Sequence, residues 1–230
     1  EVLVPSFTFI ASVNPIRHVG ATPVFVEVDK KTLTVDVEDF KKKITPKTKA
    51  AIMVPLYGHS VDYDPLLILC DEHNLHVVED AAEAHGSKYK GKRVGKFGDL
   101  SCFSFYGNKI ITTGEGGIIL TDNESLYEKM IILKNHGMSP NQKYEHPIVG
   151  YNFRMTNLQA AIGCAQLEKI ETILAKRREI NEQYEFHLKE IVDTGKIVFQ
   201  PRAEWAELNH WFFSILLVQP EKRDQLMQAL

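Results

Sequence analysis

Two residues that could do acid–base chemistry follow predicted strands at separate points of the chain. Asp80 ends the apolar run 75–79, and Lys109 follows the run 100–105 after a turn at Gly107. Open α/β sheets bind ligands at the carboxyl ends of their strands, which is where both side chains are expected. A carboxylate there can hold a cationic ring nitrogen. An amine among aromatic and apolar residues is desolvated, which lowers its pKa and makes it a nucleophile toward carbonyl groups.

Each of these residues also has a purely structural interpretation. Asp80 and Glu83 have the spacing of a capping box that opens a helix. A lone lysine such as Lys109 is most often solvated. The glycine-rich run 112–117 is either an anion-binding loop or a tight turn, and it lacks the Gly-Lys-Ser/Thr ending of a Walker A loop. The order is more specific than any single residue: an acid at a strand end, then Ser104, then Lys109, then the glycine-rich turn.

Two further places could contact a flat, phosphorylated ligand. Phe9 follows the first predicted strand, where it could stack on a ring or pack in the core. Asn152 and Arg154 precede Thr156, a predicted N-cap of a long helix. An amide and a cation at a helix start suit a phosphate, and they equally suit plain exposure to solvent.

Composition and charge exclude several classes of protein. The 230 residues are 44% hydrophobic and 25% charged, which excludes a disordered chain or a disulfide-stapled miniprotein. A net charge of −3 favours neither nucleic acid nor an acidic membrane, and no apolar run reaches the roughly 18 residues of a membrane span. The three cysteines fit neither a disulfide framework nor a zinc spacing, so we expect no metal and a reducing, cytoplasmic location.

Short apolar runs alternate with stretches of helical spacing, as in an α/β domain. Runs such as 50–54 are apolar throughout, which favours strands covered on both faces and hence a largely parallel sheet. An antiparallel α+β sheet is the alternative. The expected strands are 2–4, 24–28, 50–54, 75–79, 100–105 and 117–121, and the expected helices are 8–19, 36–43, 63–74 and 124–135.

Three parts are expected in order along the chain. Residues 1–156 form a large domain, 157–192 a long helical connection, and 193–230 the start of a smaller α+β domain with strands at 196–199 and 211–218. The chain opens on a strand without an initiator Met and stops inside a helical pattern without a cap. We therefore expect an internal fragment that lacks the N-terminal part of the large domain.

The order of these motifs resembles the DegT/DnrJ/EryC1/StrS family of sugar aminotransferases, which are fold-type I enzymes dependent on pyridoxal phosphate. The resemblance covers essentially the whole chain, and the lysine segment is its most specific part. Within the family, that segment is similar to members that aminate C4 of a GDP-linked 4-keto-6-deoxymannose. The matching segments are 4–9, 79–82, 103–117, 150–154 and 156–161.

The resemblance implies a role for each candidate residue. Lys109 would bond covalently to the cofactor and move a proton during the reaction. Asp80 would keep the pyridine nitrogen protonated, so that the ring acts as an electron sink. Phe9 would stack on the ring, and Ser104 would contact the phosphate. Glu83 stands beside the expected ring hydroxyl, where many relatives carry histidine or glutamine.

The resemblance also implies partners. Asn152, together with Arg154, would reach the cofactor phosphate of the other subunit, which makes the active sites shared in a homodimer. The substrates would be an amino acid, expected to be glutamate, and a nucleotide-linked keto sugar. The family's Ser-Gly-Thr phosphate-binding segment is absent from this chain and is expected upstream of Glu1.

Three other functions stay open at this point. A related sugar dehydratase uses the same cofactor but has histidine in place of the lysine, and Lys109 argues against it. A non-catalytic relative would bind the cofactor or a nucleotide sugar as a sensor or scaffold, and the presence of both Asp80 and Lys109 argues against that. In a plain α/β nucleotide-binding module, Lys109 would be a surface charge.

Overall fold

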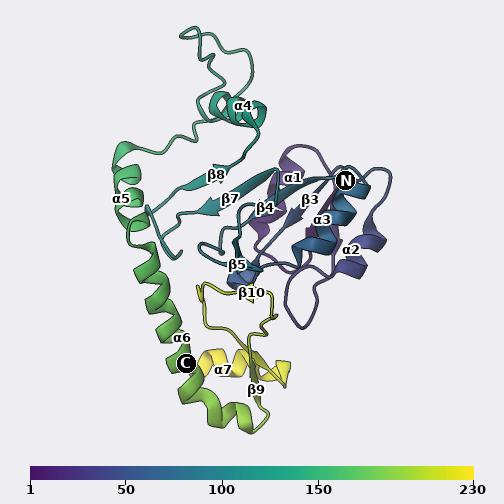
Figure 1. Cartoon of the computed structure of the whole chain (residues 1–230), viewed down its shortest axis with the longest axis vertical. Helices are drawn as coiled ribbons and strands as arrows, with labels where there is room; N and C mark the ends of the chain where they lie inside the picture. The colour runs from purple at the N-terminus through teal and green to yellow at the C-terminus, as the bar shows by residue number, and fades with distance from the viewer.

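A six-stranded, mostly parallel sheet forms the main body of the protein (Figure 1), and the computed structural model describes residues 1–230. The strand order is β2-β1-β3-β4-β7-β8, and only β8 runs antiparallel to its neighbour. The predicted largely parallel α/β sheet is therefore confirmed, with one antiparallel edge. The strands are β1 (Val2–Pro5), β2 (Pro23–Val26), β3 (Ala50–Met53), β4 (His76–Asp80), β7 (Leu100–Ser104) and β8 (Gly117–Leu120).

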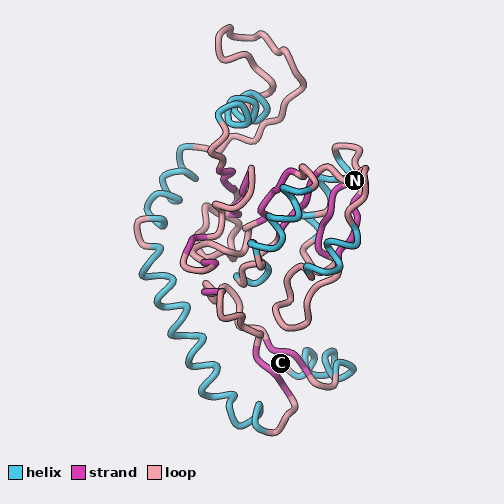
Figure 2. Tube along the Cα trace, turned by 45° about the vertical axis from the view of Figure 1, so that its right-hand side comes forward, coloured by secondary structure: helices cyan, strands magenta, loops and turns pink.

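Helices cover both faces of this sheet (Figure 2). Because side chains alternate along a strand, Leu3 and Val4 of β1 enter two separate cores. Leu3 lies in the core beneath α2 (Val37–Lys43) and α3 (Tyr63–Glu72), and Val4 packs with residues at the start of α1 (Asn14–His18).

The predicted helix 8–19 consists of two short pieces, η1 (Ile10–Ser12) and α1. Pro15 lies at the start of the second piece and lacks the N–H that a continuous helix would use. A further short turn, η2 (Leu56–Gly58), follows β3.

A long helical arm runs down one side of the sheet to the C-terminal elements (Figure 1). The expected helix 157–192 is interrupted at residues 168–169 and forms α5 (Asn157–Leu167) and α6 (Ile170–Asp193). The predicted N-cap is confirmed, because Thr156 and Gln159 exchange the two hydrogen bonds of a capping box. Before this arm, α4 (Glu124–Lys134) projects beyond the sheet.

The C-terminal segment contacts the sheet domain as well as forming its own small sheet. β9 (Ile197–Phe199) pairs antiparallel with β11 (Ile215–Leu217), and η3 (Pro220–Lys222) and α7 (Arg223–Ala229) follow. The predicted strand 211–218 is shorter than expected, since residues 211–214 are irregular. No helix in the chain has the length and apolar character needed to cross a membrane. Three short strands, which the sequence did not predict, form a further sheet: β5 (Lys88–Tyr89), β6 (Lys92–Arg93) and β10 (Ala206–Glu207).

The fully buried carboxylate of Glu79 links several elements near the middle of the main sheet by hydrogen bonds. Glu79 of β4 accepts hydrogen bonds from the hydroxyls of Tyr63 (2.6 Å) and Ser101 (2.7 Å). Burial and the charge of Glu79 raise the pKa of Tyr63 well above its usual value, so this phenol stays a donor. Five donors compensate the desolvation of one carboxylate. Besides the two hydroxyls, these donors are the backbone N–H groups of Gly95 (3.1 Å), Phe97 (2.8 Å) and Gly98 (3.2 Å).

We predict that Glu79→Gln destabilises the protein by about 3 kcal/mol, because an amide NH₂ would then face buried donors. Urea denaturation followed by circular dichroism measures this loss. The matched control is Glu72→Gln, which changes an exposed residue at the end of α3. Equal midpoints for the two variants would contradict the prediction.

Candidate active site

A cavity of about 680 Å³ opens at the carboxyl ends of β1, β3, β4 and β7, where open α/β sheets place their ligands. It is lined by residues that follow these four strands and by two residues of the distant segment before β11. The structure thereby brings together five of the predicted site residues. They are Phe9, Asp80, Glu83, Ser104 and Lys109.

Asp80 lies in the wall of this cavity at the end of β4. Its Oδ2 accepts a hydrogen bond from the Ser12 hydroxyl (2.5 Å), and its Oδ1 accepts one from the Ala82 N–H (3.3 Å). The Ser12 hydroxyl also hydrogen-bonds the Thr8 hydroxyl (2.8 Å). These contacts orient the carboxylate toward the cavity wall that it lines. Ser12 and Thr8 were not predicted from the sequence, although they lie four residues apart on either side of Phe9.

The capping-box interpretation of Asp80 and Glu83 is wrong, because residues 81–87 form turns and no helix starts there. Glu83 instead folds back toward η2, where its Oε2 accepts the backbone N–H of Tyr57 (2.8 Å). Burial raises the pKa of Glu83, while that hydrogen bond and the charge of Lys109 oppose the rise.

Lys109 projects into the same cavity from the turn after β7. Its side chain is only 12% exposed, and its Nζ lies 3.8 Å from Oε1 of Glu83. Burial lowers the pKa of Lys109, against the attraction of Glu83 and Asp80. The amine also lies over the indole ring of Trp211, 3.9 Å from its centroid. Lys109 is therefore not a solvated surface lysine.

Two further titratable groups near Lys109, the His85 imidazole and the Cys102 thiol, carry no charge at neutral pH. His85 is buried, and burial together with the charge of Lys109 lowers its pKa to about 4. Cys102 pairs in register with Asp80, and burial and that carboxylate raise its pKa to about 11. The amine of Lys109 is therefore the group in this neighbourhood that becomes a nucleophile by losing a proton.

Phe9 and Ser104 complete the cavity wall. The Phe9 ring is 69% exposed, so its interpretation as a core residue is wrong. Its face is available to a flat ligand. The Ser104 hydroxyl accepts the N–H of Tyr106 (3.2 Å). Its own proton remains available to an anionic ligand.

The glycine-rich run 112–117 forms a tight turn between β7 and β8, and none of its residues lines the cavity. The Phe105 N–H donates to Gly116 O (2.9 Å), and the Thr113 N–H donates to Phe105 O (2.9 Å). At Gly116, φ is +144° and a Cβ would lie 2.6 Å from the Thr113 hydroxyl, so the turn requires glycine.

Asn152 and Arg154 do not join the cavity. Both are exposed and lie on the segment that follows the projecting α4 (Figure 1). The backbones of Asn152 and Asn135 form an isolated antiparallel β-bridge. A guanidinium nitrogen of Arg154 lies 3.5 Å from Nε2 of His136. His136 has a left-handed backbone with φ of +61° and lies in the turn that ends α4.

A model of the DegT/DnrJ/EryC1/StrS aminotransferase family matches residues 1–230. The chain belongs to this family. It is 46% identical over its whole length to GDP-perosamine synthase of Escherichia coli O157:H7 and 45% identical to that of Vibrio cholerae. The chain spans 62% of the length of each of these relatives.

Two solved structures share the fold of this chain. DesV of S. venezuelae is 36% identical with a TM-score of 0.88, and the match covers 99% of this chain and 61% of DesV. A Streptococcus pneumoniae protein described as a sugar aminotransferase in its PLP form is 30% identical. Its TM-score is 0.91, over 100% of this chain and 64% of that one. These likenesses confirm the expected fold class.

The cavity of this family member fits pyridoxal phosphate. A carboxylate held by hydrogen bonds suits a pyridinium N–H, and an exposed phenyl face suits a flat ring. A serine proton suits a phosphate oxygen, and a largely buried amine suits an aldehyde. The four residues are Asp80, Phe9, Ser104 and Lys109.

Proposed function

We propose that this chain is the cofactor-binding part of a pyridoxal phosphate-dependent aminotransferase. The enzyme moves an amino group from an amino acid, glutamate, to a nucleotide-linked keto sugar. The likeness to GDP-perosamine synthase supports GDP-4-keto-6-deoxymannose as the acceptor and GDP-perosamine as the product. The observation that carries the proposal is the meeting of Lys109 and Asp80 in one cavity.

A bound cofactor would supply an aldehyde that can take up the amino group and a ring that can delocalise the electron pair left on the donor's Cα. In the proposal, Asp80 holds the proton on the ring nitrogen, and Ser12 keeps the carboxylate aimed at it. Lys109 would hold the cofactor covalently and, when free, would carry the proton between carbons, because its lowered pKa leaves more of the amine neutral and able to accept a proton. Glu83 lies beside the amine.

The proposed enzyme keeps the three parts expected from sequence, with the large domain at 1–156, the helical connection at 157–192 and the small domain from 193. The first part supplies the site residues discussed above. The three cysteines are free, which supports a reducing, cytoplasmic location as part of the proposal.

We predict that sodium borohydride fixes pyridoxal phosphate to Lys109 in the complete protein, as read by peptide mass mapping. Lys109→Ala should lose this label and all transamination while retaining some non-covalent cofactor binding, because the other wall residues remain. The matched control is Lys129→Ala, at an exposed position of α4, in which Lys109 should be labelled as in the wild-type protein. Full activity of Lys109→Ala would refute the assignment.

We predict that Asp80→Asn lowers the transamination rate about a thousandfold, because a neutral amide cannot keep the ring nitrogen protonated. The geometry should survive, since the amide oxygen can still accept from Ser12. Steady-state kinetics of the complete protein measure the effect, and Asp71→Asn at an exposed position of α3 is the control. A near-normal rate would show that Asp80 does not act on the cofactor.

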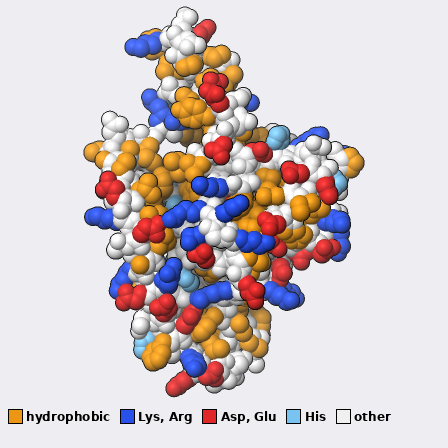
Figure 3. Space-filling model, in the orientation of Figure 1, with side chains coloured by type: hydrophobic (Ala, Val, Ile, Leu, Met, Phe, Trp, Pro, Cys, Tyr) orange, Lys and Arg blue, Asp and Glu red, His pale blue; other side chains and the backbone are white.

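The proposed enzyme is a homodimer in which Asn152 and Arg154 reach the partner's cofactor phosphate. Both side chains are exposed on a projecting segment outside their own cavity. Hydrophobic side chains gather over α5 and β8 at the upper left of Figure 3, a surface that a second copy would cover. Exposed apolar residues of this surface include Ile118, Leu158 and Ile162.

We predict a dimer by light scattering and complementation between two inactive variants, Lys109→Ala and Asn152→Asp. The added carboxylate of Asn152→Asp would repel a phosphate. In a hybrid dimer, one site has the native Lys109 of one subunit and the native Asn152 of the other. Co-expression should restore about a quarter of the wild-type sites. An active monomer, or no recovery in purified hybrids, would contradict the shared site.

A further inference from the structure

We propose that Trp211 is a positioning residue for the Lys109 amine, and that residues 200–214, the segment between β9 and β11, hold Trp211 in place. The proposal rests on the proposed function in one respect, namely that Lys109 is the residue that binds the cofactor covalently. Trp211 lies 102 positions after Lys109, and its place in the cavity wall depends on tertiary contacts rather than on its own strand propensity.

The Trp211 indole contacts both ends of the lysine residue. Its face lies 3.9 Å from Nζ of Lys109, measured to the ring centroid. Its Nε1–H donates to the carbonyl oxygen of Asn108 (2.6 Å), which precedes the lysine in the chain. A lysine side chain is flexible, and an ammonium is attracted to an aromatic face. A ring fixed to the lysine's own backbone therefore restricts where the amine can point.

Asn209 anchors Trp211 to the sheet domain. Its side-chain amide donates to the carbonyl oxygens of Glu83 (2.7 Å) and His85 (3.1 Å), and its Oδ1 accepts the Trp211 N–H (3.0 Å). Asn209 is only 3% exposed, and all these bonds are with backbone groups near the site. A Cβ at Gly58, where φ is +79°, would lie 2.0 Å from that Oδ1. The close approach of the anchor therefore requires glycine at position 58.

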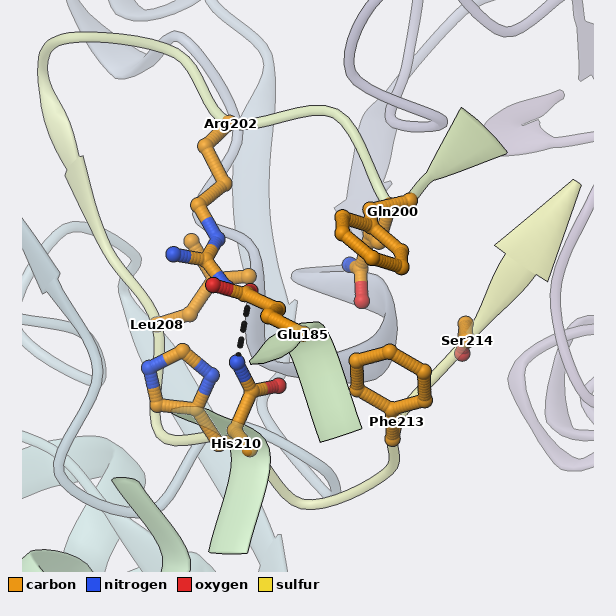
Figure 4. Close-up of a pocket in the computed structure, with 9 residues that line it drawn as sticks. Glu185, Gln200, Arg202, Leu208, His210, Phe213 and Ser214 are labelled. Carbon is orange, nitrogen blue, oxygen red and sulfur yellow. Dashed lines mark hydrogen bonds and ion pairs between the residues drawn. The ribbon is translucent and has the colours of Figure 1, made fainter. Parts of the chain in front are cut away.

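A second set of contacts holds the same segment against α6 (Figure 4). Glu185 of α6 forms an ion pair with Arg202 and accepts a hydrogen bond from the Asn181 amide (2.7 Å). His210 lies beside this pair, and burial and the charge of Arg202 lower its pKa to about 4. Its backbone is left-handed, with φ of +54°, and this turn connects Asn209 to Trp211.

The segment is thus fixed on two sides before it reaches the cavity. Phe212 extends the aromatic wall, since its ring stacks on Trp211 with centroids 3.7 Å apart and also lines the cavity. Oε1 of Glu83 lies 3.8 Å from the same Nζ. The indole and the carboxylate together define one position for the amine of Lys109.

The test measures how fast pyridoxal phosphate attaches to Lys109 in the complete protein. Aliquots are quenched with borohydride, and the label on the Lys109 peptide is quantified by mass spectrometry across a pH series. The labelling rate reaches a plateau at high pH, where the Lys109 amine is already neutral. The height of this plateau therefore depends on the position of the amine rather than on its charge. Thermal midpoints of the apo-proteins are recorded in parallel.

We expect Trp211→Leu to lower the plateau about tenfold, because the amine loses its aromatic support. Trp211→Phe keeps an aromatic face but loses the bond to Asn108, and should fall about threefold. Trp205→Phe is the matched control, because Trp205 packs on His59 and Tyr89 and does not line the cavity. It should label at the wild-type rate.

A folded Trp211→Leu protein with the wild-type plateau would overturn the proposal. If that variant does not fold, Trp211→Phe decides: a plateau about threefold lower supports the proposal, and an unchanged plateau overturns it. Failure of the proposed function has a different signature, since the wild-type protein would then carry no label on Lys109.

Discussion

The buried carboxylate of Glu79 fixes the end of β4, where the neighbouring Asp80 faces the candidate site. Glu79 and Asp80 are consecutive residues of β4, and the pleat of the strand sends them to opposite sides. Glu79 enters the core, where five donors fix it, and Asp80 faces the cavity. The donors come from α3, from β7 and from the connection that precedes β7. The buried carboxylate therefore fixes the strand end from which the catalytic candidate projects.

Much of this fold was predictable because its central strands are short, apolar and separated by helical spacing. All six strands of the main sheet lie within the predicted runs or within two residues of their ends, and α2, α3 and α4 lie close to the predicted helices. The break at residues 168–169 was not predicted, because the apolar spacing continues through it. The two-residue strands β5, β6 and β10 are too short to show any periodicity.

The site was predictable to the extent that its residues stand at strand ends. Asp80 and Ser104 end β4 and β7, and Lys109 lies in the turn after β7, so sequence position alone placed them near one edge of the sheet. Ser12 and Trp211 could not be found in this way, because tertiary contacts bring them to the cavity. At Trp211, a bond to Asn108 and one to Asn209 replace the strand that its aromatic neighbours favour.

The high pKa of Cys102 has a consequence for the covalent chemistry of this cavity. A thiol with a pKa of about 11 is almost wholly protonated in the cell, so it does not add to an aldehyde or react readily with alkylating reagents. Cys70 is buried with a pKa of about 12, and Cys164 is exposed on α5. Thiol reagents and aldehydes therefore modify different places on this molecule: the first react with Cys164 on the helical arm, and the second with Lys109.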